Sequence, residues 1–316
     1  MFLLDSHCDT PSEILRLRDL SKDNENGHVD FPKLKKGGVD GAFFALYVPA
    51  DKTEEEAYAH AYRQLEAVQA TIAANPHAAA FATSPAEAYA NKSSGLFSVF
   101  MGLENGSPIG HSIGRLHEFY DAGVRYVTLC HSSDNQICDS CASATGRWGG
   151  LSPFGKELVG HMNDIGMLVD VSHISDDAFY DVIELSGKPV VATHSCCRAL
   201  AGHPRNMTDD MIGKLAENGG VMQINFYPVF LDDTCARASF RRIADHIDHA
   251  VGIAGIDHVG IGSDFDGIEI TPEGMDDISY MPVLLAELSA RGYSESDIAK
   301  IAGENFFRVM NVCARH

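Results

Sequence analysis

The sequence predicts an α/β protein, a closed (β/α)8 barrel of the TIM type, and three observations support this prediction. Eight short apolar runs alternate with longer amphipathic stretches along nearly the whole chain, which is typical of βα units joined into a parallel sheet. The length of 316 residues suits one such barrel. No glycine-rich phosphate-binding turn follows an early apolar run, and this disfavours an open doubly wound sheet.

Each expected strand is a short apolar run that leads into polar residues. The first is the run from Phe2 to Leu4, which continues toward His7 and Asp9. The other seven strands are expected at Gly41 to Val48, Leu96 to Leu103, Tyr126 to Cys130, Met167 to Val171, Pro189 to Thr193, Val221 to Asn225 and His258 to Gly262.

Helices are expected between these strands. The longest is Thr53 to Asn75, where a threonine stands at the capping position. The others are Pro11 to Leu20, Ser112 to Ala122 followed by Gly123, Pro153 to Ile165, Ser175 to Leu185, Thr208 to Asn218, Ser239 to Ala254, and two closing helices at about Ser279 to Arg291 and Ser294 to Val312. Ser21 to Lys36 is expected to be a polar connection, and Ser132 to Gly150, rich in Gly and Ser, a lid or binding loop.

Length and composition indicate one large domain over residues 1–316, and we expect it to be a single barrel with two C-terminal helices. The chain is 45% hydrophobic and carries 24 basic against 44 acidic residues, a formal charge of -20. This charge argues against binding a nucleic-acid backbone. No run approaches the 18 apolar residues of a membrane span. Neither a signal peptide nor a C-terminal hydrophobic tail is recognisable, so we expect a cytoplasmic location and no membrane partner.

The eight cysteines are expected to be mostly free thiols, because a long chain without a secretion signal seldom carries a disulfide framework. A four-thiolate zinc site is the alternative. It would use Cys138, Cys141, Cys196 and Cys197, but adjacent cysteines are poor spacing for such a site.

Metal-competent side chains follow the expected strands at the same topological position. They are His7, Asp9, Glu104, His131, His173, His194 and Asp264. In a parallel barrel all strand carboxyl ends open on one face, so these residues should meet in one pocket. His7, Asp9, His173 and His194 supply two ligands for each of two ions, and Glu104 can bridge them. Imidazole and carboxylate ligands suit zinc, and paired ions predict hydrolysis by a shared water.

Four segments in this order resemble the membrane (renal) dipeptidase family of zinc metallopeptidases. They are the opening DSHCDTP, the GLENG of Gly102 to Gly106, the run from Val169 to Phe230, and the IGSDFDG of Ile261 to Gly267. The resemblance covers nearly the whole chain. It implies two zinc ions per chain, with His7 and Asp9 on one zinc, His173 and His194 on the other, and Glu104 bridging them.

The resemblance also implies roles for residues around the metals. His131 would contact the scissile carbonyl oxygen, Arg205 would bind the substrate's terminal carboxylate, and Asp264 would handle the proton. Tyr227 resembles a position near the substrate, and Arg198 is a rival for the carboxylate clamp. A guanidinium is a planar bidentate partner for a carboxylate. A homodimer is also implied.

Four further residues have less specific interpretations. Asp266 is expected to be a turn carboxylate before Gly267. Trp148 either lines the specificity pocket or anchors its loop, and His246 and His249 are expected to be surface or packing residues on an outer helix.

The expected function is therefore a zinc-dependent dipeptidase that cleaves the peptide bond of dipeptides, those with a D-residue at the C-terminal position included, through a metal-bridging hydroxide. The alternative is a binuclear amidohydrolase acting on another small amide, lactone or phosphoester. Such barrels usually bridge their metals with a lysine, whereas Glu104 has that place here. A barrel that binds metal or peptide without catalysis, or a scaffold protein, is a less favoured alternative.

Overall fold

The computed structural model describes residues 1–236 and 238–315, in which nine strands form one parallel sheet. The strands are β1 (Leu4–Cys8), β2 (Gly41–Tyr47), β3 (Ala79–Phe81), β4 (Phe97–Glu104), β5 (Val124–Thr128), β6 (Leu168–Asp170), β7 (Val191–Ser195), β8 (Val221–Ile224) and β9 (Val259–Ile261).

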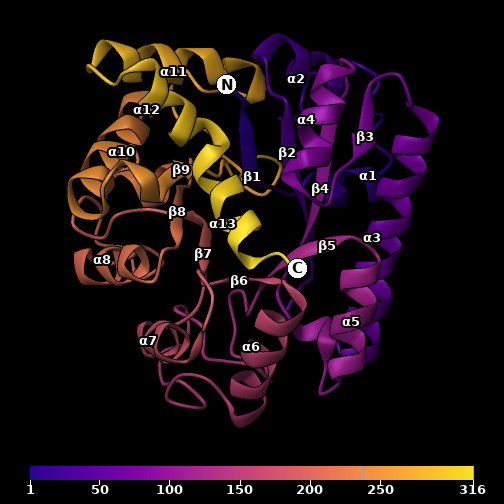
Figure 1. Cartoon of the computed structure of the whole chain (residues 1–316), viewed down its shortest axis with the longest axis vertical. Coiled ribbons are helices and arrows are strands. Elements are labelled where there is room, and N and C mark those ends of the chain that lie inside the picture. Colours follow the sequence, from indigo (N-terminus) through magenta and orange to yellow (C-terminus); the bar gives the residue numbers. More distant parts are fainter. Residues whose placement is uncertain (237, 316) are drawn as a thin grey trace.

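Eight of these strands follow one another around a barrel, in the order β1-β2-β4-β5-β6-β7-β8-β9. An isolated parallel bridge between Cys8 and Phe265 joins the first strand to the segment that follows the last one. The helices lie outside this ring of strands (Figure 1). The predicted (β/α)8 barrel is therefore confirmed, with every expected strand present.

The helices that surround the barrel account for much of the chain. They are α1 (Thr10–Leu15), α2 (Phe31–Gly37), α3 (Glu54–Ala74), α4 (Pro85–Ser93), α5 (Ile113–Asp121), α6 (Pro153–Ile165), α7 (Asp176–Leu185), α8 (Asp209–Glu217), α9 (Pro228–Leu231), α10 (Phe240–Ala254), α11 (Met281–Ala290), α12 (Glu295–Ala299) and α13 (Asn305–Cys313). Short 3-10 turns occur at Ser107–Ile109, Ile256–His258 and Ile278–Tyr280, and a π-helical turn at Lys300–Glu304 joins α12 to α13.

Helix α3 begins as its sequence predicts. The side chain of Thr53 accepts from the backbone N–H of Glu56, and the Glu56 carboxylate accepts in return from the backbone N–H of Thr53. This capping box satisfies backbone donors that the first turn would otherwise leave unpaired.

The predicted polar connection from Ser21 to Lys36 was wrong in its second half, which contains α2. Asp30 caps this helix by accepting from the backbone N–H of Lys33 at 2.9 Å, and a proline stands in its first turn. Leu34 is buried. An Asp-x-Pro start is a helix signal, but the polar residues around it conceal the short apolar face.

The small strand β3 and helices α4 and α9 were also missed, one helix end was wrong, and one predicted helix is divided. Strand β3 consists of Ala79, Ala80 and Phe81, and alanine is a poor indicator of a strand. Helix α1 ends at Leu15, and Leu17 then adopts a left-handed φ of 71°. The predicted final helix is divided by the π-helical turn into α12 and α13.

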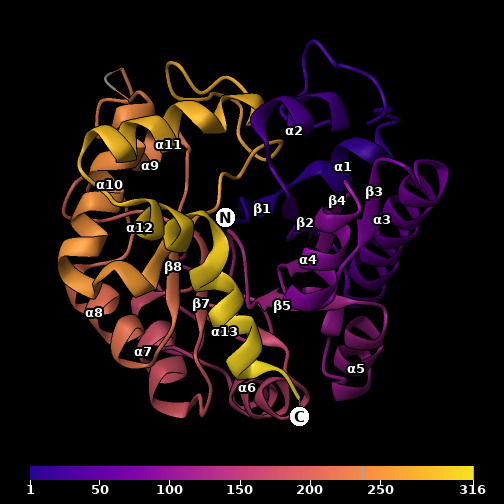
Figure 2. The ribbon, with the colours of Figure 1, turned by 45° about the horizontal axis from the view of Figure 1, so that its top comes forward.

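Aromatic side chains fill the barrel at the end opposite the strand carboxyl termini. Phe43 lies between Phe100, at 4.8 Å between ring centroids, and Phe306 of α13, at 5.1 Å. Helix α13 passes in front of the strands in both views of the ribbon (Figures 1 and 2). The packed aromatic layer closes one end of the barrel, so polar chemistry is confined to the other end.

Helices long and apolar enough to cross a membrane are absent from the part of the chain that the structure describes.

Candidate metal centre and active site

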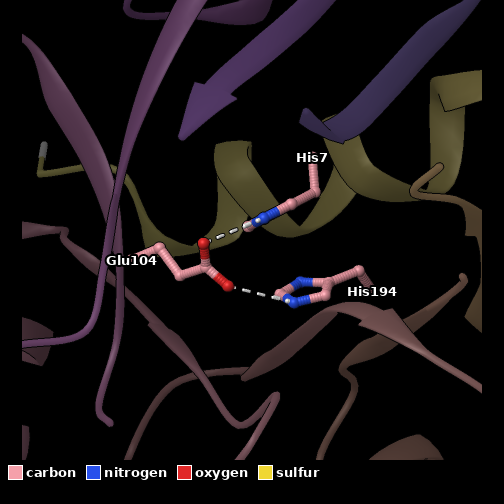
Figure 3. Close-up of side chains that lie close together, drawn as sticks. All are labelled: His7, Glu104 and His194. Carbon is pink, nitrogen blue, oxygen red and sulfur yellow. Dashed lines mark ion pairs between the residues drawn. The ribbon is translucent and has the colours of Figure 1, made fainter. Parts of the chain in front are cut away.

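The predicted metal ligands converge at the carboxyl end of the barrel. His7 and His194 lie within β1 and β7, and Glu104 is the last residue of β4. Figure 3 shows the Glu104 carboxylate between the two imidazoles. Asp9, His131, His173 and Asp264 occupy the loops that follow β1, β5, β6 and β9.

Glu104 presents its two oxygens to different partners. Its Oε2 lies 3.5 Å from Nε2 of His7. Its Oε1 lies 3.1 Å from Nε2 of His173 and 3.3 Å from Nε2 of His194. Asp9 approaches His7 from another side, at 3.6 Å between Oδ2 and Nε2. A carboxylate with one oxygen toward each group of ligands has the arrangement of a bridging ligand.

The donor atoms form three overlapping groups, in each of which they lie within 4.8 Å of one another. The groups are His7, Glu104 and His194; Glu104, His131 and His173; and His7, Asp9 and Asp264. None of these groups contains a cysteine. The four-thiolate alternative therefore has no support among the described residues.

Several buried nitrogen and oxygen atoms of the cluster lack hydrogen-bond partners within the described ranges, and a bound cation would replace those partners. Nε2 of His7 and Oδ1 of Asp9 are buried without a hydrogen-bond partner among the described residues. Nε2 of His173 and Nε2 of His194 are 2.8 Å apart, so one of them must donate to the other unless both face a cation. Unpaired buried polar atoms are costly, and a divalent cation would satisfy all of them.

The charges of the cluster shift the pKa values of its members. Burial opposes charge on His7, but Glu104 and Asp9 raise the pKa of this imidazole well above its ordinary value. Burial, followed by the charge of Glu104, raises the pKa of Asp9 to about 6. Burial lowers the pKa of His173 and of His194 well below the ordinary value. The site therefore attracts positive charge while two imidazoles stay neutral, as metal ligands must be.

His131 lies beside the cluster at its more open side. Its Nε2 is 3.7 Å from Oε1 of Glu104, and its ring centroid is 4.2 Å from that of His173. Tyr47, at the end of β2, contacts its ring edge-on at 4.9 Å. Burial lowers the pKa of His131 to about 4. A neutral imidazole here can donate a hydrogen bond to a substrate oxygen.

The carboxyl group of Asp264 has a pKa close to neutral pH. Burial and then the nearby charge of Asp9 raise its pKa to about 7. Its Oδ2 accepts from Nδ2 of Asn225 at 2.8 Å, and its backbone N–H donates to the carbonyl of His7 at 3.0 Å. Its backbone has a left-handed φ of 65°, a conformation that costs energy and often occurs at functional sites.

Arg205 reaches the cavity, whereas Arg198 is engaged elsewhere. Arg205 donates through Nη1 to Ser195 Oγ at 2.9 Å and through Nη2 to the carbonyl of His194 at 2.6 Å. Its Nε is buried and has no partner within the described ranges. Arg198 instead forms a bidentate pair with Asp176 at 2.6 and 2.7 Å.

A cavity of about 640 Å³, a volume suited to a small ligand, is bordered by Asp9, Glu104, His131, His173, Arg205 and Asp264. Tyr227 contributes to its wall and donates to Glu269 at 3.2 Å. Tyr47 and Phe230 also line the cavity, and sequence reasoning missed both. Tyr47 is the second-to-last residue of the strand predicted at Gly41 to Val48 and lies at the same face as the predicted metal ligands, a signal that could have identified it.

Trp148 and Asp266 have structural contacts. The indole N–H of Trp148 donates to the carbonyl of Asn135 at 2.8 Å, which anchors the loop, and Trp148 does not line the cavity. Asp266 is more than a turn carboxylate. It pairs with Arg18 at 2.5 Å and accepts from the Thr10 hydroxyl at 2.9 Å, so it ties the loop after β9 to the N-terminal segment.

A parallel (β/α)8 barrel with imidazole and carboxylate donors gathered at its carboxyl end defines the class of metal-dependent hydrolases. Comparison with known proteins narrows this class. The model of the membrane dipeptidase family (peptidase family M19) matches residues 1–315. The chain belongs to this family, and it is an enzyme of the metallo-dipeptidase type.

Individual relatives agree with this membership. An uncharacterized dipeptidase of Schizosaccharomyces pombe is 32% identical over 97% of this chain and 80% of its own length. Dipeptidase verJ of Clonostachys rogersoniana is 36% identical over 90% and 75%, respectively. The crystal structure of a metallo peptidase from Rhodobacter sphaeroides, liganded with a phosphinate mimic of the dipeptide L-Ala-D-Ala, is 28% identical. It matches with a TM-score of 0.92 over 99% of both chains.

Proposed function

We propose that this enzyme is a dipeptidase with two zinc ions per chain and that it cleaves the single peptide bond of dipeptides, including those with a D-residue at the C-terminal position. The proposal rests on the placement of the two carboxylate oxygens of Glu104. Oε2 lies toward His7, and Oε1 lies toward His173 and His194. The dipeptide mimic bound to the Rhodobacter sphaeroides relative supports the substrate class and the D-configuration.

In this proposal His7 and Asp9 would hold one ion and His173 and His194 the other, with Glu104 between them. When bound, two such ions activate a shared water and stabilise the charge that develops on the attacked oxygen. Zinc is the metal that imidazole and carboxylate ligands suit best. The protein's contribution is to fix the donor atoms in a buried site that excludes bulk water.

The remaining residues would bind and orient the substrate. The free carboxylate of the dipeptide would lie against Arg205, whose Nε has no partner among the described residues. His131 would donate to the scissile carbonyl oxygen, and a donor aimed at developing negative charge stabilises the transition state. Tyr227 would line the wall beside the substrate.

Asp264 would handle the proton. With its pKa raised to about 7, its carboxyl group can take a proton from the attacking water and return it to the leaving amine near neutral pH. Asn225 holds Oδ2, which leaves Oδ1 for this exchange.

A homodimer in solution is proposed on the family resemblance alone, and the cytoplasmic location expected from the sequence stays a prediction. Light scattering of the purified protein and fractionation of cells that produce it would test them.

A substrate panel tests the proposed function. We expect turnover of L,L and L,D dipeptides, loss of turnover with a chelator, and recovery on adding zinc. Turnover of an N-blocked amino-acid amide without turnover of any dipeptide would overturn the proposal and favour the wider amidohydrolase class.

The Asp264→Ala variant tests the mechanism separately. It should keep its zinc content and lose turnover by roughly 100-fold or more, as expected when a general acid–base group is removed. Glu269→Gln is the control, because it alters an exposed carboxylate of the same cavity and should change turnover only a few-fold. Normal turnover in Asp264→Ala would contradict the assignment.

A further inference from the structure

A buried carboxylate lies behind the proposed ligands, and the mechanism does not use it. Asp170, the last residue of β6, is fully buried. Its Oδ1 accepts from the backbone N–H groups of Ser172 at 3.0 Å and Thr193 at 2.9 Å. Its Oδ2 accepts from the hydroxyls of Thr128 and Thr193, both at 2.6 Å. Asp170 therefore receives four hydrogen bonds, as an acceptor-only group can.

The bonds to Asp170 determine the direction of the hydrogen bond between Thr193 and His194. The Thr193 hydroxyl has one proton, and it is committed to Asp170. Toward Nδ1 of His194, at 2.8 Å, the same hydroxyl can therefore act only as an acceptor. Nδ1 of His194 must carry the ring proton, and its Nε2 presents a lone pair toward Glu104. A tautomer fixed in this way is the one that a metal ligand bound through Nε2 requires.

His7 has an equivalent support. Its Nδ1 lies 2.9 Å from the Tyr126 hydroxyl and 3.5 Å from the Thr193 hydroxyl. The rings of His7 and His194 stack at 3.7 Å between centroids. Nε2 of His7 makes no hydrogen bond in the described structure, and the nearest carboxylate oxygens, those of Glu104 and Asp9, lie 3.5 and 3.6 Å from it. With Nε2 on a cation, the ring proton would stand on Nδ1 and be donated to the Tyr126 hydroxyl.

The barrel makes room for the tyrosine. Gly102 of β4 pairs with Tyr126 of β5, and a Cβ atom at Gly102 would lie 2.0 Å from Cζ of that ring. Tyr126 is fully buried. The absence of a side chain at Gly102 therefore allows the phenol to reach His7 from inside the barrel.

We propose that Thr193, held by Asp170, and Tyr126 are positioning residues that orient His194 and His7 by accepting from their Nδ1 atoms, and so direct their Nε2 atoms toward a metal. This inference rests on the proposed metal centre and adds to it a supporting layer of hydroxyl groups. Such partners typically change metal affinity by about 10- to 100-fold.

Zinc affinity of the full chain, measured by competition with a chromophoric chelator, tests the proposal. Thr193→Val, which removes the hydroxyl, should weaken binding of one zinc by roughly 10- to 100-fold. Thr193→Ser, which keeps the hydroxyl, should bind within about threefold of the unmodified protein.

Thr128→Val is the matched control. It removes a hydroxyl bond to the same oxygen of Asp170 but contacts neither imidazole, so its zinc affinity should be nearly unchanged. Tyr126→Phe should weaken zinc binding, as Thr193→Val does. Unchanged zinc affinity in Thr193→Val, or an equal loss in Thr128→Val, would overturn the proposal.

A measurement on the unmodified, metal-free protein keeps the test independent of folding defects and of catalysis. In long-range ¹H–¹⁵N spectra of the histidine side chains, His194 should show the Nδ1–H tautomer. An Nε2–H tautomer would overturn the inference whatever the substrate is. Failure of the protein to bind zinc or cleave dipeptides, with the Nδ1–H tautomer present, would count against the proposed function instead.

Discussion

At the scale of single residues, function depends on which partners a side chain already has. Arg198 and Arg205 lie seven positions apart in one loop. Both carboxylate oxygens of Asp176 accept hydrogen bonds from the guanidinium of Arg198. Arg205 is held by Ser195 and the backbone of His194, and its Nε is left without a partner in the described structure. This difference favours Arg205 as the group that binds the substrate carboxylate.

We expect Arg205→Lys to raise KM for dipeptides by about 10-fold or more, with a smaller effect on kcat. A lysine keeps the charge but loses the planar fork and the bonds that orient it, and loss of uniform binding appears in KM. Arg198→Lys should leave both constants within about twofold. Steady-state kinetics of the two variants would contradict the assignment if Arg198→Lys had the larger effect.

His246 is expected from the sequence on the surface or in packing, and the structure places it in full burial on α10. Its Nδ1 accepts from the backbone N–H of Cys197, and its Nε2–H donates to the carbonyl of Leu231, both at 3.0 Å. Both nitrogens are used in the neutral form. Burial lowers the pKa of this imidazole from 6.5 to about 4.

This shift predicts a loss of stability in acid. Because the folded pKa is depressed, the unfolded chain binds the proton first, and the free energy of unfolding falls as the pH drops from about 6.5 to about 4. The loss should reach roughly 3 kcal/mol at pH 4. In urea unfolding of the metal-free His246→Gln variant, the free energy of unfolding should depend less steeply on pH across this range.

His249→Gln is the comparison for this experiment, because His249 lies on the same helix but pairs with Asp209 at 2.7 Å. The same flattening in both variants would show that the effect does not belong to His246.

The sequence identified residues that follow strands better than residues within them. Each predicted metal ligand lies in the last two positions of a strand or in the loop that follows it, where topology gives its position. Tyr126 and Thr193 lie inside strands, and both types are ordinary strand formers. Their contacts with His7 and His194 depend on side-chain packing across the barrel, which no local pattern records.

At the scale of elements, the register of β4 against β5 positions the site. Gly102 pairs with Tyr126, and Glu104 pairs with Thr128 at the strand ends. The pairing places the ring of Tyr126 over Gly102 and brings Thr128 near the same end as Glu104. One strand pair thus supplies the proposed bridging ligand, Glu104, and the Tyr126 hydroxyl that contacts His7.

We expect Gly102→Ala to destabilise the protein by about 2 kcal/mol, the usual cost of overpacking a core, because its Cβ would overlap the Tyr126 ring. Gly160→Ala is the control. This glycine lies in α6, and a Cβ atom added to it would have no neighbouring atom within 4 Å outside its own helix backbone. The change should therefore stabilise the helix by about 0.5 to 1 kcal/mol. Thermal or urea unfolding of both variants measures this, and equal effects would contradict the packing argument.

Elements with long periodic patterns were predicted well, and short ones were not. Helix α3 extends over 21 residues with a capping box, and its ends are correct within one residue. Strand β3 has three residues and α2 has seven, too few for a periodic pattern to stand out. Their positions depend on neighbours, since β3 forms only by pairing with β4.

At the scale of the whole molecule, barrel closure brings together the proposed site residues, which extend from residue 7 to residue 264. The order of strands and the bridge from Cys8 to Phe265 place the first and last segments side by side. Asp264 therefore donates its backbone N–H to the carbonyl of His7. A barrel converts residues separated by most of the chain into one pocket, and this is why the sequence could predict the site without predicting its distances.

Zinc titration of the metal-free protein, with bound zinc and dipeptide turnover measured on the same samples, tests the central claim most directly. The account predicts that each chain binds two zinc ions and that turnover rises to its plateau as the second ion binds. Two bound ions without turnover of any dipeptide, or full turnover without bound metal, would contradict it.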